Sequence, residues 1–205
     1  MYRSPDYRHL VSLNAIWLAG LIVSGWSPYD RATWWMEVAP VLIVIPLLWV
    51  TRWRLPLTGL ALCLIALHGL VLMAGGTYTY ARVPLGFDLQ NWLGLARNPY
   101  DRFGHLMQGF VPAIVIRELL IRVGRMAPGR LLTTLVLACC LAVSASYELI
   151  EFAAAMLLGQ GADEFLGTQG DPWDTQWDML MCAVGAVFSL IALSCVHDRQ
   201  IRRMA

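Results

Sequence analysis

Charged side chains are scarce in this sequence, and lysine is missing altogether. Only 14% of the 205 residues are charged, whereas a soluble domain carries about a quarter. This shortage, in a largely hydrophobic chain, excludes a disordered protein and argues against a soluble enzyme. All 15 basic residues are arginine and the formal net charge is +1. The chain therefore lacks the basic excess of a nucleic-acid-binding protein, and we expect no nucleic-acid partner.

The sequence also lacks the short motifs that identify common catalytic and metal sites. It contains no HExxH, no GxSxG and no P-loop. Its five cysteines lie in apolar stretches without a CxxC pair, which indicates small buried side chains rather than a disulfide framework or a zinc site. These cysteines are Cys63, Cys139, Cys140, Cys182 and Cys195.

Long apolar runs are what the sequence has in excess. Hydrophobic residues make up 58% of the chain, and its mean hydropathy is +0.58. A membrane-spanning helix needs about 20 apolar residues. Six such runs predict an all-α fold, a polytopic membrane bundle of about six transmembrane helices in a single domain over residues 1–205. The predicted spans are Leu10–Trp26, Trp34–Val50, Leu55–Gly76, Phe103–Ile121, Leu131–Gly159 and Trp177–Val196.

Polar residues divide this domain into three regions. Residues 1–76 are interpreted as scaffold helices, residues 77–102 as an outer loop, and residues 103–205 as the helices that carry a polar site.

With six spans, both termini share one side of the membrane, and that side holds 11 of the 15 arginines. The positive-inside rule then predicts that both termini are cytoplasmic.

Two segments, 73 residues apart, open the fourth and sixth spans with the same pattern. Asn98–Asp101 and Asp171–Asp174 each supply a helix-capping residue, a proline suited to the first helical position, an aromatic residue and an acid. Four residues further on come His105 and Asp178. Each helix is therefore expected to carry an i, i+4 polar pair on one face, at the same depth in the membrane.

The fifth span carries two carboxylates, Glu148 and Glu151, within an apolar helix. An ionised side chain at mid-membrane costs at least ~2.5–3.5 kcal/mol, so such residues usually have a function. We expect the three spans to bring their acids together in the outer third of the membrane. Five carboxylates there sum to −5 if ionised, and Arg102 and a protonated His105 are the nearby cations that the sequence indicates. The acids are Asp101, Glu148, Glu151, Asp174 and Asp178.

This combination of carboxylates and imidazole favours a divalent metal, Zn, Mn, Fe or Mg, over a soft metal. The predicted metal ligands are His105, Glu148, Asp174 and Asp178, and the predicted catalytic bases are Glu151 and Asp101. Further binding residues are Arg102, Gln108, Tyr147, Gln169 and Asp171, with His68 as an additional candidate. The alternative is structural: helix-start acids at a wet interface, polar contacts between helices and a satisfied histidine. Residues 159–171 form either a lid or a solvated connector.

Several of these motifs resemble a known family. They are Arg97–His105, Gln108–Ala113, Arg117–Glu118, Ser144–Glu148, Glu151, Phe165–Asp171, Trp173–Asp174, Asp178–Met179 and His197–Gln200. They resemble the YjdF-like family of bacterial inner-membrane proteins, which carry a domain of unknown function. The resemblance covers nearly the whole chain and implies a small polytopic inner-membrane protein without an established reaction. A weaker resemblance, in the order of polar residues alone, is to VanZ-like proteins, which are linked to glycopeptide resistance.

Three functions are compatible with this pattern. The first is a metal-dependent intramembrane enzyme that acts on a lipid or lipid-linked group at the outer leaflet, with Arg102 holding an anionic head group. The second is an accessory protein whose exposed acidic outer face binds a partner. The third is a proton or cation transporter, which requires a polar path to the cytoplasm. We rank the enzyme first and the transporter last.

Overall fold

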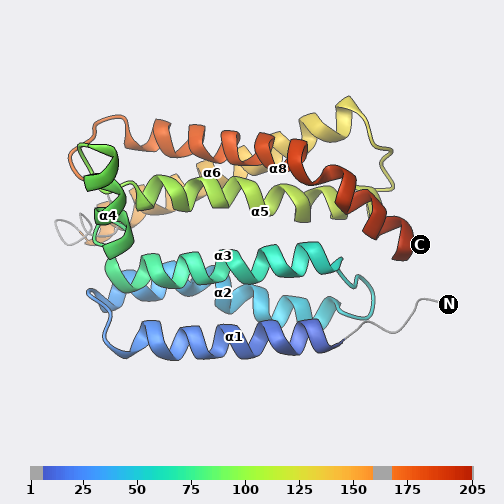
Figure 1. Cartoon of the computed structure of the whole chain (residues 1–205), viewed down its shortest axis with the longest axis horizontal. Coiled ribbons are helices and arrows are strands. Elements are labelled where there is room, and N and C mark those ends of the chain that lie inside the picture. The colour runs from blue at the N-terminus through green and yellow to red at the C-terminus, as the bar shows by residue number, and fades with distance from the viewer. Residues whose placement is uncertain (1–6, 159–167, 205) are drawn as a thin grey trace.

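The computed structural model describes residues 7–158 and 168–204, and all regular elements in those ranges are α-helices (Figure 1). Six of the helices are long and apolar enough to cross a membrane, which confirms the predicted all-α membrane bundle. The elements are α1 (Tyr7–Trp26), α2 (Arg31–Thr51), α3 (Gly59–Tyr78), α4 (Pro84–Leu93), α5 (Tyr100–Arg122), α6 (Arg130–Leu158) and α8 (Asp174–Met204).

One helix end lies well beyond its predicted position. Helix α8 continues to Met204, well beyond the predicted end at Val196. The polar residues that follow Val196 look like a helix end in the sequence, but His197 is fully buried in the bundle. Its ring bonds to side chains of α5, so the helix continues without an unsatisfied polar group.

The predicted outer loop contains a short helix. Helix α4 begins with Pro84 at its first turn and ends at Gly94, which has a left-handed φ of 64°. Proline at the start and glycine just past the end are the usual signals for a helix of this kind. Residues 77–102, predicted as an outer loop between two spans, thus include a ten-residue helix over Pro84–Leu93.

The six long helices lie side by side in two groups (Figure 1). Helices α1, α2 and α3 pack together, as do α5, α6 and α8, and α3 joins the groups by packing against α5. The start of α1 and the end of α8 lie at one end of the bundle, which we call the end that carries the termini, and α4 lies at the other (Figure 1). We call the end near α4 the α4 end. The even number of spans accounts for this arrangement of the termini.

The contact between α5 and α8 is the most extensive in the bundle. Two glycines make it possible, Gly109 on α5 and Gly185 on α8. A Cβ atom on Gly109 would collide with the carbonyl oxygen of Cys182, and one on Gly185 would collide with that of Leu106. Small residues allow helix backbones in membranes to approach closely in this way. The approach brings the polar pairs of the two helices into contact.

Candidate functional site

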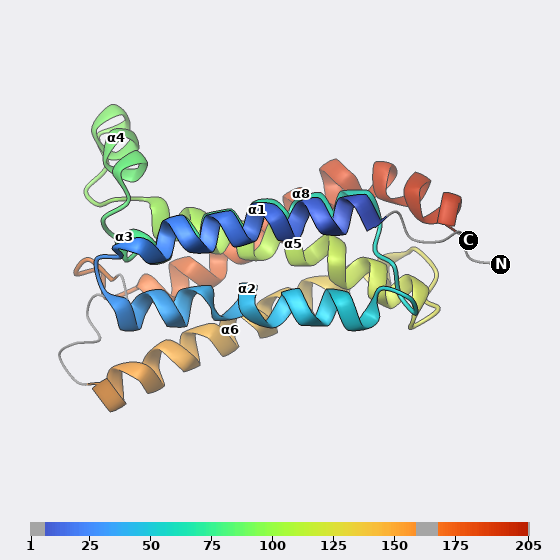
Figure 2. The same cartoon turned by 90° about the horizontal axis from the view of Figure 1, so that it is seen from below.

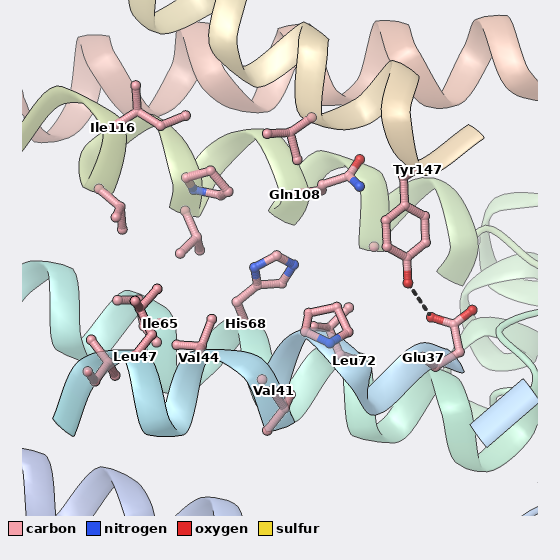
Figure 3. Close-up of a pocket in the computed structure, with 18 of the residues that line it drawn as sticks. Glu37, Val41, Val44, Leu47, Ile65, His68, Leu72, Gln108, Ile116 and Tyr147 are labelled. Atoms are coloured by element: carbon pink, nitrogen blue, oxygen red, sulfur yellow. Dashed lines mark hydrogen bonds between the residues drawn. The ribbon is translucent and has the colours of Figure 1, made fainter. Parts of the chain in front are cut away.

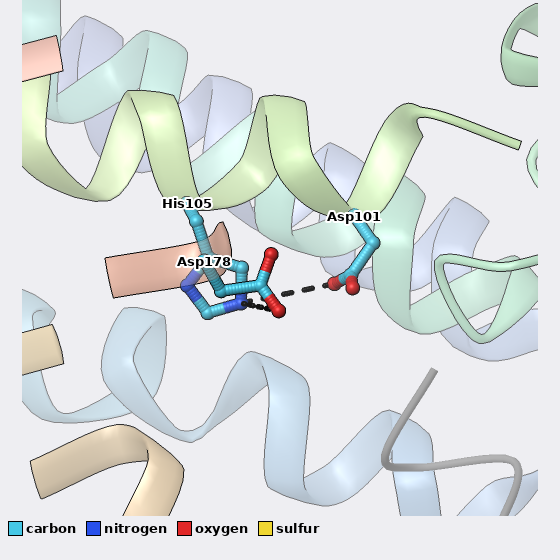
Figure 4. A group of neighbouring side chains, drawn as sticks. All are labelled: Asp101, His105 and Asp178. Atoms are coloured by element: carbon cyan, nitrogen blue, oxygen red, sulfur yellow. Dashed lines mark ion pairs between the residues drawn. The ribbon is translucent and has the colours of Figure 1, made fainter. Parts of the chain in front are cut away.

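Asp101 and His105 of α5 lie beside Asp178 of α8 (Figure 4), and both helices start at the α4 end of the bundle (Figure 1). The two helix starts share a local structure, because Asn98 Oδ1 accepts a hydrogen bond from Tyr100 N at 3.0 Å and Asp171 Oδ1 accepts one from Trp173 N at 2.9 Å. The repeated sequence pattern thus produces the same turn twice. The two prolines lie just before their helices rather than at the first helical position as predicted.

Asp101, His105 and Asp178 form the centre of the site (Figure 4). The Nε2 atom of His105 lies 3.8 Å from Asp101 Oδ1 and 4.0 Å from Asp178 Oδ2. One ligand atom from each of the three residues lies within 4.8 Å of the others, and all three side chains are buried. Glu148 on α6 adds a fourth group, with its Oε1 atom 3.9 Å from His105 Nδ1. The spacing of Asp101, His105 and Asp178 is compatible with a bound metal ion.

Gln108 orients the ring of His105. Its Oε1 atom lies 3.0 Å from His105 Nδ1. An amide oxygen only accepts hydrogen bonds, so in this contact Nδ1 is the donor, and the ring turns Nε2 towards Asp101 and Asp178. A histidine that binds a metal usually donates its other ring N–H to such an oxygen. The contact with Gln108 therefore holds the His105 ring with Nε2 facing the two aspartates.

Two carboxylate oxygens in this cluster have no hydrogen-bond partner among the described residues. They are Oε1 of Glu148 and Oδ1 of Asp178, and both atoms are buried. Buried polar atoms in folded proteins nearly always have a partner, and an exception calls for an explanation such as a bound ion or water. The two oxygens thus point to a ligand that binds between α5, α6 and α8.

Arg97 is the cation that the sequence analysis missed. It precedes α5 and forms ion pairs with Asp174 on α8 and, at 3.4 Å, with Asp101. The prediction that Arg102 and His105 are the nearby cations is therefore incomplete. Arg102 binds Asp171 at 2.6 Å and its guanidinium lies over the ring of Trp177. The sequence offers no signal that separates the two arginines, because both lie within four residues of Asp101.

Asp174 and Gln169 have partners outside the central group. Asp174, predicted as a metal ligand, is ion-paired with Arg97. Gln169, predicted as a binding residue, bonds the backbone of Asn98 twice: its Oε1 accepts from Asn98 N and its Nε2 donates to Asn98 O, each at 3.0 Å. Gln169 therefore ties the start of α8 to the start of α5. The predicted lid, residues 159–171, falls mostly outside the described residues.

A cavity of about 580 Å³ opens beside this cluster, between α2, α3, α5 and α6 (Figure 3). Asp101 and His105 belong to both the cluster and the cavity wall. Most of the wall is apolar, and its polar groups gather towards the α4 end. Among the predicted site residues, His68, Gln108, Tyr147 and Glu151 also line it. His68 projects into the cavity (Figure 3), where its buried Nε2 atom has no hydrogen-bond partner among the described residues.

Glu37 on α2 is a cavity residue that the sequence analysis did not identify. Its side chain is buried, and its Oε2 atom accepts a hydrogen bond of 3.3 Å from the hydroxyl of Tyr147 on α6 (Figure 3). A single acid within an apolar span was the available signal. Glu37 brings a carboxylate from the predicted scaffold region to the same cavity as Glu151.

Tyr80 is a further polar group at this end of the cavity. Its ring lies where a Cβ atom on Gly75 or Gly104 would be, so both glycines make room for it. Burial raises the pKa of Tyr80 well above its usual range, so the hydroxyl stays protonated. Tyr80 lines the cavity, whereas Tyr78 is 42% exposed.

A separate polar cluster lies near the end of the bundle that carries the termini. Glu118 accepts hydrogen bonds from Thr58 N at 2.9 Å and from Thr58 Oγ1 at 2.7 Å, and its Oε2 lies 3.1 Å from His197 Nε2. Arg117 bonds His197 Nδ1 at 3.1 Å and Asp198 at 2.6 Å. Each of these groups has a partner, as expected for a structural network that joins α3, α5 and α8.

Six membrane-spanning helices around a buried carboxylate and imidazole cluster define a polytopic helical membrane protein with an internal polar site. The chain belongs to the DUF2238 family of predicted membrane proteins, whose model matches residues 9–199. It is similar to the inner membrane protein YjdF of Escherichia coli (strain K12), with 55% identity over 184 residues that cover 89% of this chain and 88% of the relative. No solved structure matches the chain. The YjdF-like resemblance is thus confirmed, and the comparisons do not show the VanZ-like one.

Proposed function

We propose that this protein is a metal-dependent enzyme of the bacterial inner membrane that acts on a lipid or lipid-linked group at the outer leaflet. One observation carries the proposal. Asp101, His105 and Asp178 present ligand atoms within 4.8 Å of one another, beside the polar end of a cavity that is otherwise apolar. A reactive site at the end of a hydrocarbon-lined space matches an amphipathic substrate.

The same geometry supports specific roles. Asp101 Oδ1, His105 Nε2 and Asp178 Oδ2 serve as metal ligands. Glu148, predicted as a ligand, lies nearest to His105 Nδ1 and outside this group of three. Asp174, which the sequence predicted as a ligand, is not part of the proposed metal site, because its charge is neutralised by the ion pair with Arg97. When bound, a divalent ion of this kind supplies Lewis-acid activation of a substrate oxygen or of water. Glu151, which lines the cavity, accepts the proton that the reaction releases.

The orientation follows from the arginines. In the six-span topology, eleven of the 15 fall on the side of the membrane that holds the termini, which favours a cytoplasmic location for both termini and an outer location for the polar site. The inner membrane is supported by similarity to a relative that is named as an inner membrane protein.

Two observations weigh against the alternative functions. An accessory protein that docks a partner through its acids needs them exposed, but Glu148 and Glu151 are buried with the rest of the cluster. A transporter needs a polar path between the two ends. Beyond Gln108, the cavity wall on α5 consists of apolar residues as far as Leu119, and the far polar cluster is internally satisfied.

Metal analysis of the purified protein tests the proposal. We expect wild-type protein, purified in detergent without chelator, to contain or take up a stoichiometric divalent ion among Zn, Mn, Fe and Mg. Asp178→Asn should lose most of it, whereas Asp88→Asn, a change to an exposed acid on α4, should retain it. Exhaustive chelation should lower the melting temperature of wild type, because a ligand at 100 times its Kd stabilises a fold by ~2.7 kcal/mol. If none of the four ions binds or stabilises the wild type, the metalloenzyme proposal fails.

A further inference from the structure

The cavity has an open edge between α2 and α6. Helix α2 packs against α1 and α3, and α6 against α5 and α8, but contact between α2 and α6 is slight. Figure 2 shows the two helices on the same side of the bundle. Leu47 on α2 and Val143 on α6 line the cavity and are nevertheless 54% and 44% exposed. Because this side of a membrane protein faces hydrocarbon, the cavity communicates with the bilayer rather than with water.

A single hydrogen bond marks the α4 end of this edge. The Tyr147 hydroxyl of α6 donates to Glu37 of α2 at 3.3 Å (Figure 3), the one α2–α6 hydrogen bond found in the described part of the chain. This hydrogen bond can break without repacking a helix interface, because α2 and α6 are in slight contact. The edge is therefore suited to admit a ligand sideways.

The length and volume of the cavity restrict what fits. Its lining runs from Glu37 to Thr51 on α2, which at 1.5 Å per residue is about 21 Å. That exceeds the ~15 Å of one leaflet's hydrocarbon, half of a ~30 Å core. The volume of about 580 Å³ holds about 19 water-sized groups at ~30 Å³ each. These dimensions match one long chain with a small head group, and they are too small for a lipid with two such chains.

The polar groups in the cavity wall indicate which type of lipid head group the cavity can bind. A chain gains little on leaving lipid for an apolar wall, because both surroundings are hydrocarbon. Recognition therefore falls to the polar end, which offers the carboxylates of Glu37, Asp101 and Glu151. No arginine is among the described residues that line the cavity. Acceptor-rich walls without a guanidinium favour a head group that donates hydrogen bonds.

We infer that the cavity binds a single-chain amphipathic lipid with a hydroxyl- or amine-bearing head group, which enters from the bilayer between α2 and α6. The head group lies between Glu37 and His105, and the chain extends along α2 and α5 towards Leu119. The inference rests on the proposed function for the identity of the site and adds the class of its ligand.

Photolabelling of the full-length protein in detergent tests this inference. The probe is monopalmitoylglycerol with a diazirine near the end of its chain, and labelled residues are located by mass spectrometry. We expect labelling of cavity residues near Val44 and Ile116. Unlabelled monopalmitoylglycerol should compete, while dipalmitoylglycerol and palmitoyl phosphate should compete roughly tenfold less well or worse.

Filling the cavity provides the matched variants. Val44→Trp places a large ring in the chain-binding region and should reduce labelling roughly tenfold or more. Ile43→Trp adds the same ring one residue away, on a side chain that is 64% exposed and does not line the cavity, and should leave labelling unchanged. Ile116→Trp fills the cavity from α5, so the test survives if Val44→Trp does not fold. Equal labelling of a folded cavity variant and wild type overturns the inference, as does equal competition by the two-chain lipid.

Metal content separates the two proposals. Val44→Trp should keep the metal and lose the label. Asp178→Asn should lose the metal and keep the label, because Asp178 does not line the cavity. Specific labelling of a protein that binds no metal overturns the metalloenzyme and supports the lipid site. Metal binding without specific labelling overturns the lipid site alone.

Discussion

Gln108 Oε1 lies 3.0 Å from Nδ1 of His105, one turn earlier on the same helix. This contact holds the ring in the orientation in which Nε2 faces Asp101 and Asp178. Gln108 is thus a positioning residue, which acts on the site through His105. The contact between Gln108 and His105 lies entirely within α5. It affects the site because the oriented ring faces Asp178, which α8 supplies.

Replacement of Gln108 should weaken metal binding. Loss of a group that orients a ligating histidine typically costs 10–100-fold in metal affinity. We therefore expect Gln108→Ala to raise the metal Kd by ~10-fold or more, as measured by titration of metal-free protein. Gln108→Glu, which keeps an acceptor oxygen beside Nδ1, should restore much of the affinity. An unchanged Kd in Gln108→Ala would show that His105 needs no orienting partner.

Both chain ends should be cytoplasmic. The arginine distribution favours that orientation, and both ends lie on the same side of the bundle (Figure 1). Alkaline phosphatase, which is active only in the periplasm, should be inactive when fused after Ala205 and active when fused after Gly94. The reverse pattern would move the polar site to the cytoplasmic leaflet and contradict the proposed outer location.

Substitution of Gly109 should disrupt the crossing of α5 and α8. A Cβ atom there collides with the backbone of Cys182, which a side-chain movement does not relieve. Overpacking typically costs 1–3 kcal/mol, so Gly109→Ala should lower the melting temperature in detergent clearly. The control is Gly129→Ala, because that glycine has open space around it. If the two variants melt alike, the helices are not in backbone contact.

The second polar cluster should contribute to stability without affecting the metal. Glu118 is fully buried and accepts from Thr58, Arg122 and His197. Removing one partner of a buried charged network costs about 3–5 kcal/mol. Glu118→Gln should therefore melt far below wild type, whereas the exposed change Arg125→Gln should not. A change in metal content of folded Glu118→Gln would connect the two clusters and revive the transport alternative.

The start of α2 predicts a pH dependence. Asp30 caps this helix by accepting from Thr33 N at 2.7 Å, and that bond holds the pKa of Asp30 below its ordinary value of 3.8. A lowered pKa contributes stability that is present above pH 3.8 and disappears as the pH falls through the folded-state pKa. Asp30→Ala should cost about 1 kcal/mol at neutral pH, and the deficit should shrink in acid.

Asp30→Asn supplies the control for this cap. Asparagine caps helices about as well as aspartate and does not titrate, so this variant should melt like wild type at neutral pH. Thermal melts at several pH values measure the difference. A deficit of Asp30→Ala that is the same at every pH would assign the effect to something other than the ionised cap.

Much of the architecture follows from local pattern. Apolar runs of spanning length predict the six long helices, because a bilayer requires the backbone bonds of each span to close within the helix. The four-residue spacing of Asp101 and His105 places both side chains on one helix face whatever surrounds them. In contrast, α4 went unrecognised because a ten-residue helix of mixed polarity resembles a loop.

Contacts between residues on different helices cannot be predicted from such local patterns. The sequence indicates that Asp101, Glu148 and Asp178 share a depth, because depth depends on position along each helix. It does not indicate that Arg97 neutralises Asp174, that Glu37 meets Tyr147, or that a cavity lies between them. Those contacts depend on how close the helices approach and on their rotation. The distance between two helices and their rotation are set by the close packing of side chains that are 77 or 110 residues apart in the sequence. The pattern of residues within one helix carries no information about that packing.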